Sequence, residues 1–190
     1  MIKRRWRGVD ARAVKVTAAC LLMAGCAAGP GSGVRASLGS TEGWPQVPVD
    51  AFPAAVARVV DGDTFVARRS GRDVRVRLIG IDAPESVKPD APVQCFGPES
   101  ARALTELLRP GTRLMAHYQG TTERDQYGRD LWDVWVAGRF LQAELVSRGL
   151  ARARAYRPQT EYADVLEQLG QQAETAHLGL FGACPRGDAA

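Results

Sequence analysis

The chain has 190 residues, enough for one ordinary domain with extensions and for a real hydrophobic core. Its formal net charge is +4, but six basic residues and one acidic residue lie within the first 25, which leaves 19 basic and 20 acidic residues in the remainder. Overall charge therefore does not indicate a polyanionic partner, and any attraction for phosphate must come from local clusters of basic residues.

Residues 1–25 are typical of a signal peptide, with a basic start, a short apolar run and then small residues. The apolar run is too short to span a bilayer as a mature helix. The letters LLMAGC, which end at Cys26, resemble a bacterial lipoprotein signal in which the cysteine is acylated. We therefore expect export and a lipid anchor at Cys26 on the extracytoplasmic side of the membrane, with plain secretion as the alternative.

The stretch 26–51 begins with many small residues and prolines and shows no periodicity, so it is expected to be a flexible tether. The folded domain is predicted over residues 52–184, followed by a short tail at 185–190. Once the leader is removed and Cys26 is lipidated, Cys95 and Cys184 remain in an oxidising compartment. We predict that these two cysteines form a disulfide, and two separate buried thiols are the alternative.

Hydrophobic patterns within the domain predict five short strands and three helices in chain order. The strands are expected at 55–60, 64–68, 74–81, 112–118 and 131–136, and the helices at 97–109, 140–148 and 162–177. An Asp-Gly pair, a strong hairpin signal, separates the first two strands. This composition favours an α+β fold, a five-stranded OB-fold β-barrel with about three helices packed on it, and such barrels commonly bind nucleic acid.

Four carboxylates stand out at the ends of these strands: Asp61, Asp63, Asp82 and Glu85. Residues two apart in an extended segment face the same side, so Asp61 and Asp63 can converge. A cluster of oxygen ligands without histidine or cysteine suits hard cations such as Ca²⁺ or Mg²⁺.

Two arginines complement the acids, since Arg77 lies on the strand that leads to Asp82 and Arg129 lies in a turn before the fifth strand. A guanidinium group can hold a phosphate through two parallel hydrogen bonds. Taken singly, each of these residues is typical of a turn or a solvated surface. As a set, acids, cation and arginines predict a site for phosphodiester displacement.

Five stretches occur in the order found in the staphylococcal nuclease (thermonuclease) family, which the chain resembles over about residues 54–182. They read VVDGDTF, VRLIGIDAPES, CFGPESARALTELL, RDQYGRDLWDVWV and LVSRGLARARAYRP. The resemblance implies that Asp63 and Asp82 bind Ca²⁺ directly, that Asp61 acts mainly through the waters of the metal, and that Ala83 supplies a backbone carbonyl. Together with the predicted signal peptide, it leads us to expect an exported bacterial member.

The same resemblance implies that Glu85 is the general base and that Arg77 and Arg129 clamp the phosphate. It places Tyr127 and Tyr156 at the nucleotide site. Arg154 stands where the family has a second tyrosine, so base stacking is expected to differ, and Arg154 could instead hold a phosphate or stack through its guanidinium plane.

The implied activity is Ca²⁺-dependent hydrolysis of DNA and RNA, mainly single-stranded or frayed, with low sequence specificity and 3′-phosphate ends. A monomer is expected. Two other classes of protein stay open from the sequence: a non-catalytic OB-type binding module, and a lipoprotein in which Ca²⁺ only stabilises the fold.

Overall fold

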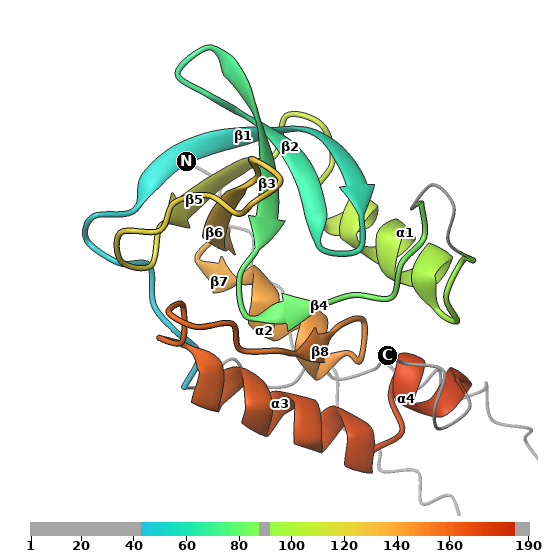
Figure 1. Cartoon of the computed structure of the whole chain (residues 1–190). Coiled ribbons are helices and arrows are strands. Elements are labelled where there is room, and N and C mark those ends of the chain that lie inside the picture. Colours follow the sequence, from blue (N-terminus) through green and yellow to red (C-terminus); the bar gives the residue numbers. More distant parts are fainter. Residues whose placement is uncertain (1–42, 88–91, 185–190) are drawn as a thin grey trace, which may run out of the picture. The chain divides into compact units, whose positions relative to one another are not determined.

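The structure, a computed structural model, describes residues 43–87 and 92–184 (Figure 1). The predicted signal peptide, the lipidation site Cys26, most of the tether and the tail at 185–190 lie outside the described residues. Within the described part of the chain, no helix is both long enough and apolar enough to cross a membrane.

Five strands form a closed barrel. The strands β1 (Phe52–Asp61), β2 (Thr64–Arg69) and β3 (Arg72–Leu78) make an antiparallel meander. The strand β5 (Arg113–His117) pairs with β1, and β6 (Asp130–Val136) pairs with β5. A parallel pairing between β3 and β6 closes the ring. The predicted five-stranded OB-type barrel is therefore confirmed.

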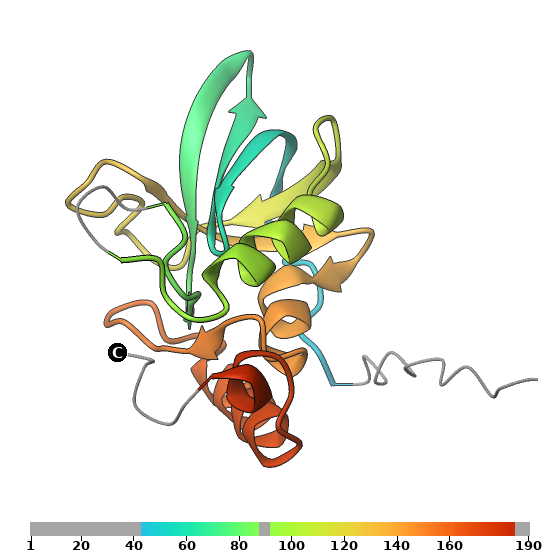
Figure 2. The ribbon, with the colours of Figure 1, turned by 90° about the vertical axis from the view of Figure 1, so that its right-hand side faces the viewer.

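Three main helices and one short helix accompany the barrel (Figures 1 and 2). The helix α1 (Gly97–Leu107) packs beside β1, and α2 (Leu141–Ser147) lies between β6 and α3 (Ala163–Thr175). The short α4 (Leu180–Ala183) follows α3 and packs against it. The α+β class and the number of main helices agree with the prediction.

The predicted strand over 74–81 is interrupted. The strand β3 ends at Leu78, and Gly80 turns the chain with a φ of 75°, a left-handed conformation that glycine adopts at little cost. The next two residues form β4 (Ile81–Asp82), which leaves the barrel and pairs with β8 (Arg152–Ala153). These very short strands, and β7 (Arg139–Phe140), carry no sequence periodicity.

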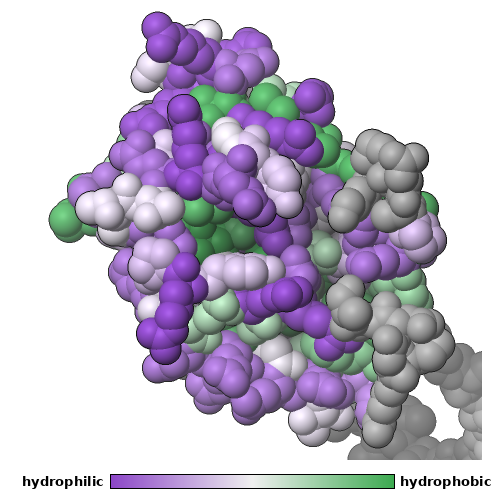
Figure 3. All heavy atoms as spheres, viewed as in Figure 1, coloured by the Kyte–Doolittle hydropathy of each residue, from purple (hydrophilic) through white to green (hydrophobic). Residues whose placement is uncertain are grey.

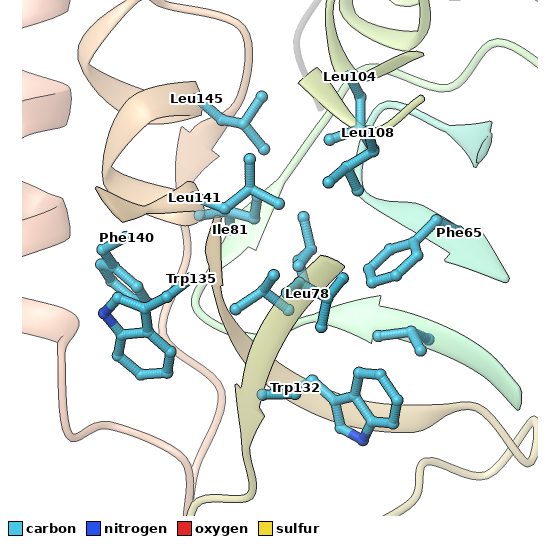
Figure 4. Packing of buried hydrophobic residues seen from close by; sticks show 14 of the residues in the cluster. Phe65, Leu78, Ile81, Leu104, Leu108, Trp132, Trp135, Phe140, Leu141 and Leu145 are labelled. Carbon is cyan, nitrogen blue, oxygen red and sulfur yellow. The ribbon is translucent and has the colours of Figure 1, made fainter. Parts of the chain in front are cut away.

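The core fills the barrel and the layer between the barrel and the helices (Figure 4). Phe65 and Trp132 are fully buried inside the barrel with an edge-to-face ring contact. The helix α2 adds Leu141 and Leu145, which lie near Ile81. Each such side chain contributes about 1.5–3 kcal/mol on burial, so the barrel is a rigid base for the loops at its rim.

Packing begins upstream of the predicted start at residue 52. Trp44 and Val47 pack against the core, and the indole N–H of Trp135 donates a hydrogen bond to the carbonyl of Pro45 over 2.9 Å. The guanidinium of Arg139 lies 5.7 Å from the centre of the Trp44 ring. A single tryptophan among small residues gives no periodic signal, so the sequence could not place this contact.

Candidate active-site cleft

Gly62 allows two acidic residues to approach the segment that follows β4. A Cβ atom at Gly62 would lie 2.7 Å from Cβ of Ala83 and 2.9 Å from Cβ of Ser100, far inside contact distance. Gly62 does not have a positive φ, so this position needs glycine for space. The hairpin turn therefore packs closely here, with Asp61 on one side of Gly62 and Asp63 on the other.

Arg77 joins two of the predicted metal ligands. Its Nη1 lies 3.0 Å from Oδ2 of Asp63, and its Nη2 donates to Oδ1 of Asp82 over 2.8 Å. The backbone N–H of Ala83 also donates to Oδ2 of Asp63, over 2.9 Å. Burial raises the pKa of Asp63, and the charge of Arg77 and the Ala83 hydrogen bond oppose that rise. The guanidinium thus compensates two acids that lie close together.

Asp61 and Glu85 are neighbours at the other side of the cluster. Burial raises the pKa of Asp61 to about 6, and the Glu85 carboxyl and the charge of Asp63 act in the same direction. Hydrogen bonds to Oδ1 of Asp61 from the Ser86 hydroxyl (2.6 Å) and the Gly62 N–H (2.8 Å) oppose this rise. Burial and the neighbouring acids thus make a negative charge on Asp61 costly.

The loop before β6 presents Arg129 and Tyr127. The Nε atom of Arg129 donates to Oδ2 of Asp125 over 2.6 Å, and its backbone N–H donates to Oδ1 over 2.9 Å. Burial works to raise the pKa of Asp125, but these hydrogen bonds and the charge of Arg129 lower it overall. Tyr127 is 75% exposed, and its ring centre lies 5.4 Å from the Arg129 guanidinium. Asp125 therefore fixes the direction of Arg129 and leaves the tyrosine ring accessible.

Arg154 makes an ion pair that the sequence did not predict. Its Nη1 donates to Oδ2 of Asp82 over 2.8 Å, and its backbone N–H donates to the carbonyl of Gly80 over 2.8 Å. Its guanidinium also lies 5.3 Å from the ring centre of Tyr156. Asp82 is therefore held by one arginine at each carboxylate oxygen.

One cleft of about 770 Å³ is lined by every residue predicted for catalysis, metal binding or nucleotide binding. These ten residues are Asp61, Asp63, Arg77, Asp82, Ala83, Glu85, Tyr127, Arg129, Arg154 and Tyr156. They come from five separate parts of the sequence, and the barrel rim brings them together.

A second cavity of about 560 Å³ adjoins the cleft, since Arg77, Tyr127, Arg129 and Tyr156 line both. Its lining adds the apolar side chains of Leu78, Ile79 and Leu131. Figure 3 shows an apolar hollow on this face of the molecule, surrounded by hydrophilic side chains. Charged groups suited to a phosphate thus lie beside apolar surface suited to a flat ring.

Several residues of the site were missed from the sequence. Arg75 lines the cleft, Ser86 donates to Asp61, and the amide oxygen of Gln94 accepts the backbone N–H of Glu85 over 2.8 Å. The alternation with Arg77 along β3 could have identified Arg75. Ser86 and Gln94 act through loop contacts, for which a single sequence offers no signal.

The donor chemistry of the cleft fits a hard cation. The carboxylates of Asp61, Asp63 and Asp82 line the cleft together with Ala83, and close packing of like charges is what a bound cation relieves. Among residues 43–87 and 92–184, however, no three histidine, cysteine, aspartate or glutamate side chains stand ready as a metal cage. In this structure Arg77 and Arg154 contact oxygens of Asp63 and Asp82.

The predicted disulfide between Cys95 and Cys184 is confirmed, with a Cα–Cα distance of 5.8 Å and 89 residues of sequence separation. It joins the segment before α1 to the end of α4. Both cysteines line a smaller cavity of about 270 Å³ that also contacts Asp82 and Arg154. The cross-link therefore lies directly beside the cleft.

The barrel and a cleft lined by acids and arginines are typical of proteins that bind phosphate groups. Comparison with known proteins identifies the family. Residues 75–182 match the family described as staphylococcal nuclease homologue. The thermonuclease of Staphylococcus intermedius is 39% identical over 126 residues, covering 66% of this chain and 74% of that protein. The thermonuclease of Staphylococcus hyicus is 40% identical over 126 residues, with 66% and 73% covered.

The endonuclease YncB of Bacillus subtilis (strain 168) is 35% identical over 125 residues, which cover 65% of this chain and 59% of that protein. With the family match and the two thermonucleases, this similarity extends over most of the described domain. The chain belongs to the staphylococcal nuclease family.

Proposed function

We propose that the protein is a nuclease that hydrolyses phosphodiester bonds in DNA and RNA with the help of Ca²⁺, with low sequence specificity. One observation carries this proposal: a single cleft is lined by all four acids and both arginines that the family pattern assigns to the reaction. Family membership and the similarity to thermonucleases and endonucleases support the class of activity.

Glu85 is proposed to orient and deprotonate the attacking water, a role that requires a carboxylate beside the reacting phosphorus. Arg77 and Arg129 both line the cleft, Arg77 from β3 and Arg129 from the loop before β6, the strand that pairs with β3. Both are proposed to hold the phosphate and to stabilise the extra negative charge of the five-coordinate transition state. Arg129 is oriented for this by Asp125.

Asp61, Asp63, Asp82 and the Ala83 carbonyl are the groups proposed to hold the Ca²⁺ ion, Asp61 mainly through water. When bound, the ion polarises a phosphoryl oxygen and neutralises charge. Together the acids make this part of the cleft negative. The negative charge is balanced either by an arginine of the protein or by a bound metal ion. Arg77 compensates Asp63 and Asp82 in this structure.

Tyr127 and Tyr156 border the adjoining apolar cavity, and both side chains are exposed. We propose that they stack against nucleobases, which favours single-stranded or frayed substrate because only unpaired bases offer their faces. Since stacking tolerates every base, little sequence preference is expected. Cleavage is proposed to leave 3′-phosphate ends.

The site of action is proposed to be outside the cytoplasm, either anchored through a lipid on Cys26 or secreted. The Cys95–Cys184 disulfide supports an oxidising compartment. The domain itself is proposed to act as a monomer, because one copy supplies every residue proposed for catalysis, metal binding and nucleotide binding.

Cleavage of labelled single-stranded DNA by the purified chain in Ca²⁺ tests the proposed residues. Glu85→Gln is expected to lower kcat by about 10²–10⁴-fold because the general base is lost. Arg129→Ala is expected to lower it by about 10²–10³-fold because a charge donor to the transition state is lost. Arg102→Ala, a solvent-exposed arginine on α1, is the matched control and should cleave at the wild-type rate. Wild-type rates for Glu85→Gln and Arg129→Ala would contradict the assignment.

A further inference from the structure

The register of the β1–β2–β3 meander arranges charged residues in rows on its outer face. Residues directly opposite one another on paired strands point to the same side of a sheet. Thr64 pairs with Asp61 on β1 and with Arg77 on β3, and these three residues all line the cleft. This row is therefore the edge of the site.

The next outward-facing row continues away from the cleft. Val66 pairs with Arg58 on β1 and with Arg75 on β3. Both arginines are exposed, whereas Val66 between them is buried. Arg75 itself also lines the cleft, so the second row is continuous with the first.

In the described part of the chain, Arg58 and Arg75 lack the acidic partners that the arginines of the site have. Arg77, Arg129 and Arg154 each contact a carboxylate at 3.0 Å or less. Within residues 43–87 and 92–184, neither Arg58 nor Arg75 forms a salt bridge or a side-chain hydrogen bond. Residues 26–190 carry slightly more acidic than basic residues, so two uncompensated neighbouring arginines are not a consequence of overall charge.

We propose that this outer row, Arg58 and Arg75, binds the phosphate backbone of a single-stranded polynucleotide that extends from the cleft. The inference rests on the proposed nuclease function and adds an extended substrate-binding surface to it. The substrate class that follows is a chain longer than the cleft, bound by its backbone and therefore without sequence preference.

The spacing suits an extended strand. Arg75 and Arg77 are two residues apart on β3, so their Cα atoms are separated by roughly 6.8 Å. Arg58 is two strands away from Arg75, which separates their Cα atoms by about 10 Å. Long arginine side chains can contact successive phosphates over such distances, and Arg77 at the start of the path is the proposed clamp for the scissile phosphate.

Equilibrium binding of a labelled 20-nucleotide single-stranded DNA to the full chain, in EDTA so that no cleavage occurs, tests the proposal. The double variant Arg58→Gln/Arg75→Gln is expected to bind about five- to twenty-five-fold more weakly near 0.1 M salt, because two phosphate contacts are lost. The slope of log K against log salt should fall in magnitude by about 1.4, and by about 0.7 for each single variant.

The matched control is Arg102→Gln/Arg109→Gln, which removes two exposed charges from and just beyond α1, outside the cleft lining. Its binding and salt slope should equal those of the wild type. Equal slopes for all three proteins, or equal losses in both double variants, would overturn the proposal. If the Arg58→Gln/Arg75→Gln variant lost binding to anionic phospholipid vesicles but kept wild-type binding to DNA, the proposal would also be overturned.

Failure of the proposed function gives a different result. If the wild-type chain does not cleave the same oligonucleotide in Ca²⁺, the nuclease assignment fails whatever the binding data show. If cleavage occurs and the binding of the Arg58→Gln/Arg75→Gln variant is unchanged, the surface inference alone fails.

Discussion

Arg77 explains how several acids can share one partly buried cluster. Asp63 is only 6% exposed and would be costly as an isolated charge, but the guanidinium lies within 3.0 Å of it and 2.8 Å of Asp82. The proposed phosphate clamp is therefore also the counter-charge of the proposed metal ligands. Loss of Arg77 would leave buried acids without compensation as well as the phosphate without a partner.

Arg154 donates to Oδ2 of Asp82, a proposed cation ligand, so its removal should strengthen cation binding. Both partners are partly exposed, so the ion pair contributes little, about 0–1 kcal/mol. Arg154→Gln is accordingly expected to bind Ca²⁺ about two- to fivefold more tightly, measured by calorimetric titration of the chain with Ca²⁺ alone. Arg152→Gln, a neighbouring arginine that pairs with no carboxylate in the described residues, serves as control. Weaker Ca²⁺ binding by Arg154→Gln would contradict this view of the ion pair.

Asp133 is a buried acid away from the cleft, and it makes stability depend on pH. Burial, the largest cause, raises its pKa to about 8, with Gln119 opposing and Glu161 adding to the rise. His117 lies 3.9 Å from the same carboxyl, and Gln142 also donates to it. The folded state therefore keeps a proton on Asp133 that the unfolded chain releases near its ordinary pKa.

Because the folded state binds the extra proton, Asp133 contributes to the free energy of unfolding. This contribution is fully present below about pH 4 and is lost as the pH rises through about 8. Relative to Asp133→Asn, the free energy of unfolding of the wild type should fall by at most about 1.4 kcal/mol per pH unit across this window. Urea unfolding at several pH values measures the difference. Parallel pH profiles for the two proteins would show that Asp133 does not titrate in this way.

Among single residues, those with a chemical signature could be predicted from the sequence. The acids at strand ends, the arginine of the Tyr-Gly-Arg turn and the two cysteines were identified because their chemistry and order are distinctive. The partner of Arg154 could not be predicted. It depends on the antiparallel pairing of β4 with β8, two strands of two residues each that lie 70 residues apart.

At the scale of elements, two glycines couple α1 to the site. A Cβ at Gly62 would collide with Ala83 and Ser100, and a Cβ at Gly97 would lie 2.5 Å from the backbone oxygen of Glu85. The first turn of α1 therefore packs directly on the segments that present the acids. This packing helps to position the acidic edge of the cleft.

Gly62→Ala should destabilise the fold and distort the site together. The added methyl group overpacks a tight contact, which costs about 1–3 kcal/mol. Gly170→Ala on α3 is the matched control, because its Cβ would meet only ordinary contacts at 3.5 Å or more and alanine favours a helix by about 1 kcal/mol. Thermal unfolding should show opposite shifts for the two variants. An unchanged melting temperature for Gly62→Ala would contradict the tight packing of the turn.

Long elements were predictable because periodicity reports them, and short ones were not. The strands of the barrel and the three main helices follow the hydrophobic pattern. The break at Gly80 was missed because Val74 to Ile81 reads as one apolar alternation, whereas in the structure Gly80 turns the chain and Ile81 pairs with Ala153 outside the barrel. The packing of residues 44–47 was missed for the same reason, since the partner of Pro45, Trp135, and the partner of Trp44, Arg139, are distant in sequence.

At the scale of the whole domain, closure of the barrel is what assembles the site. The parallel pairing of β3 with β6 places Arg77 opposite Leu131, two residues after Arg129. The β4–β8 pairing adds Arg154, and the disulfide ties the end of α4 to the segment before α1. Function therefore depends on long-range contacts, although every participating residue belongs to a short local motif.

The central claim is that this cleft hydrolyses phosphodiester bonds with a bound cation. Incubation of the purified chain with end-labelled single-stranded DNA in Ca²⁺ or in EDTA, followed by analysis of the product ends, tests it most directly. We predict internal cleavage with 3′-phosphate ends in Ca²⁺ and intact substrate in EDTA. Binding of the DNA without cleavage in Ca²⁺, or equal cleavage in EDTA, would contradict the account.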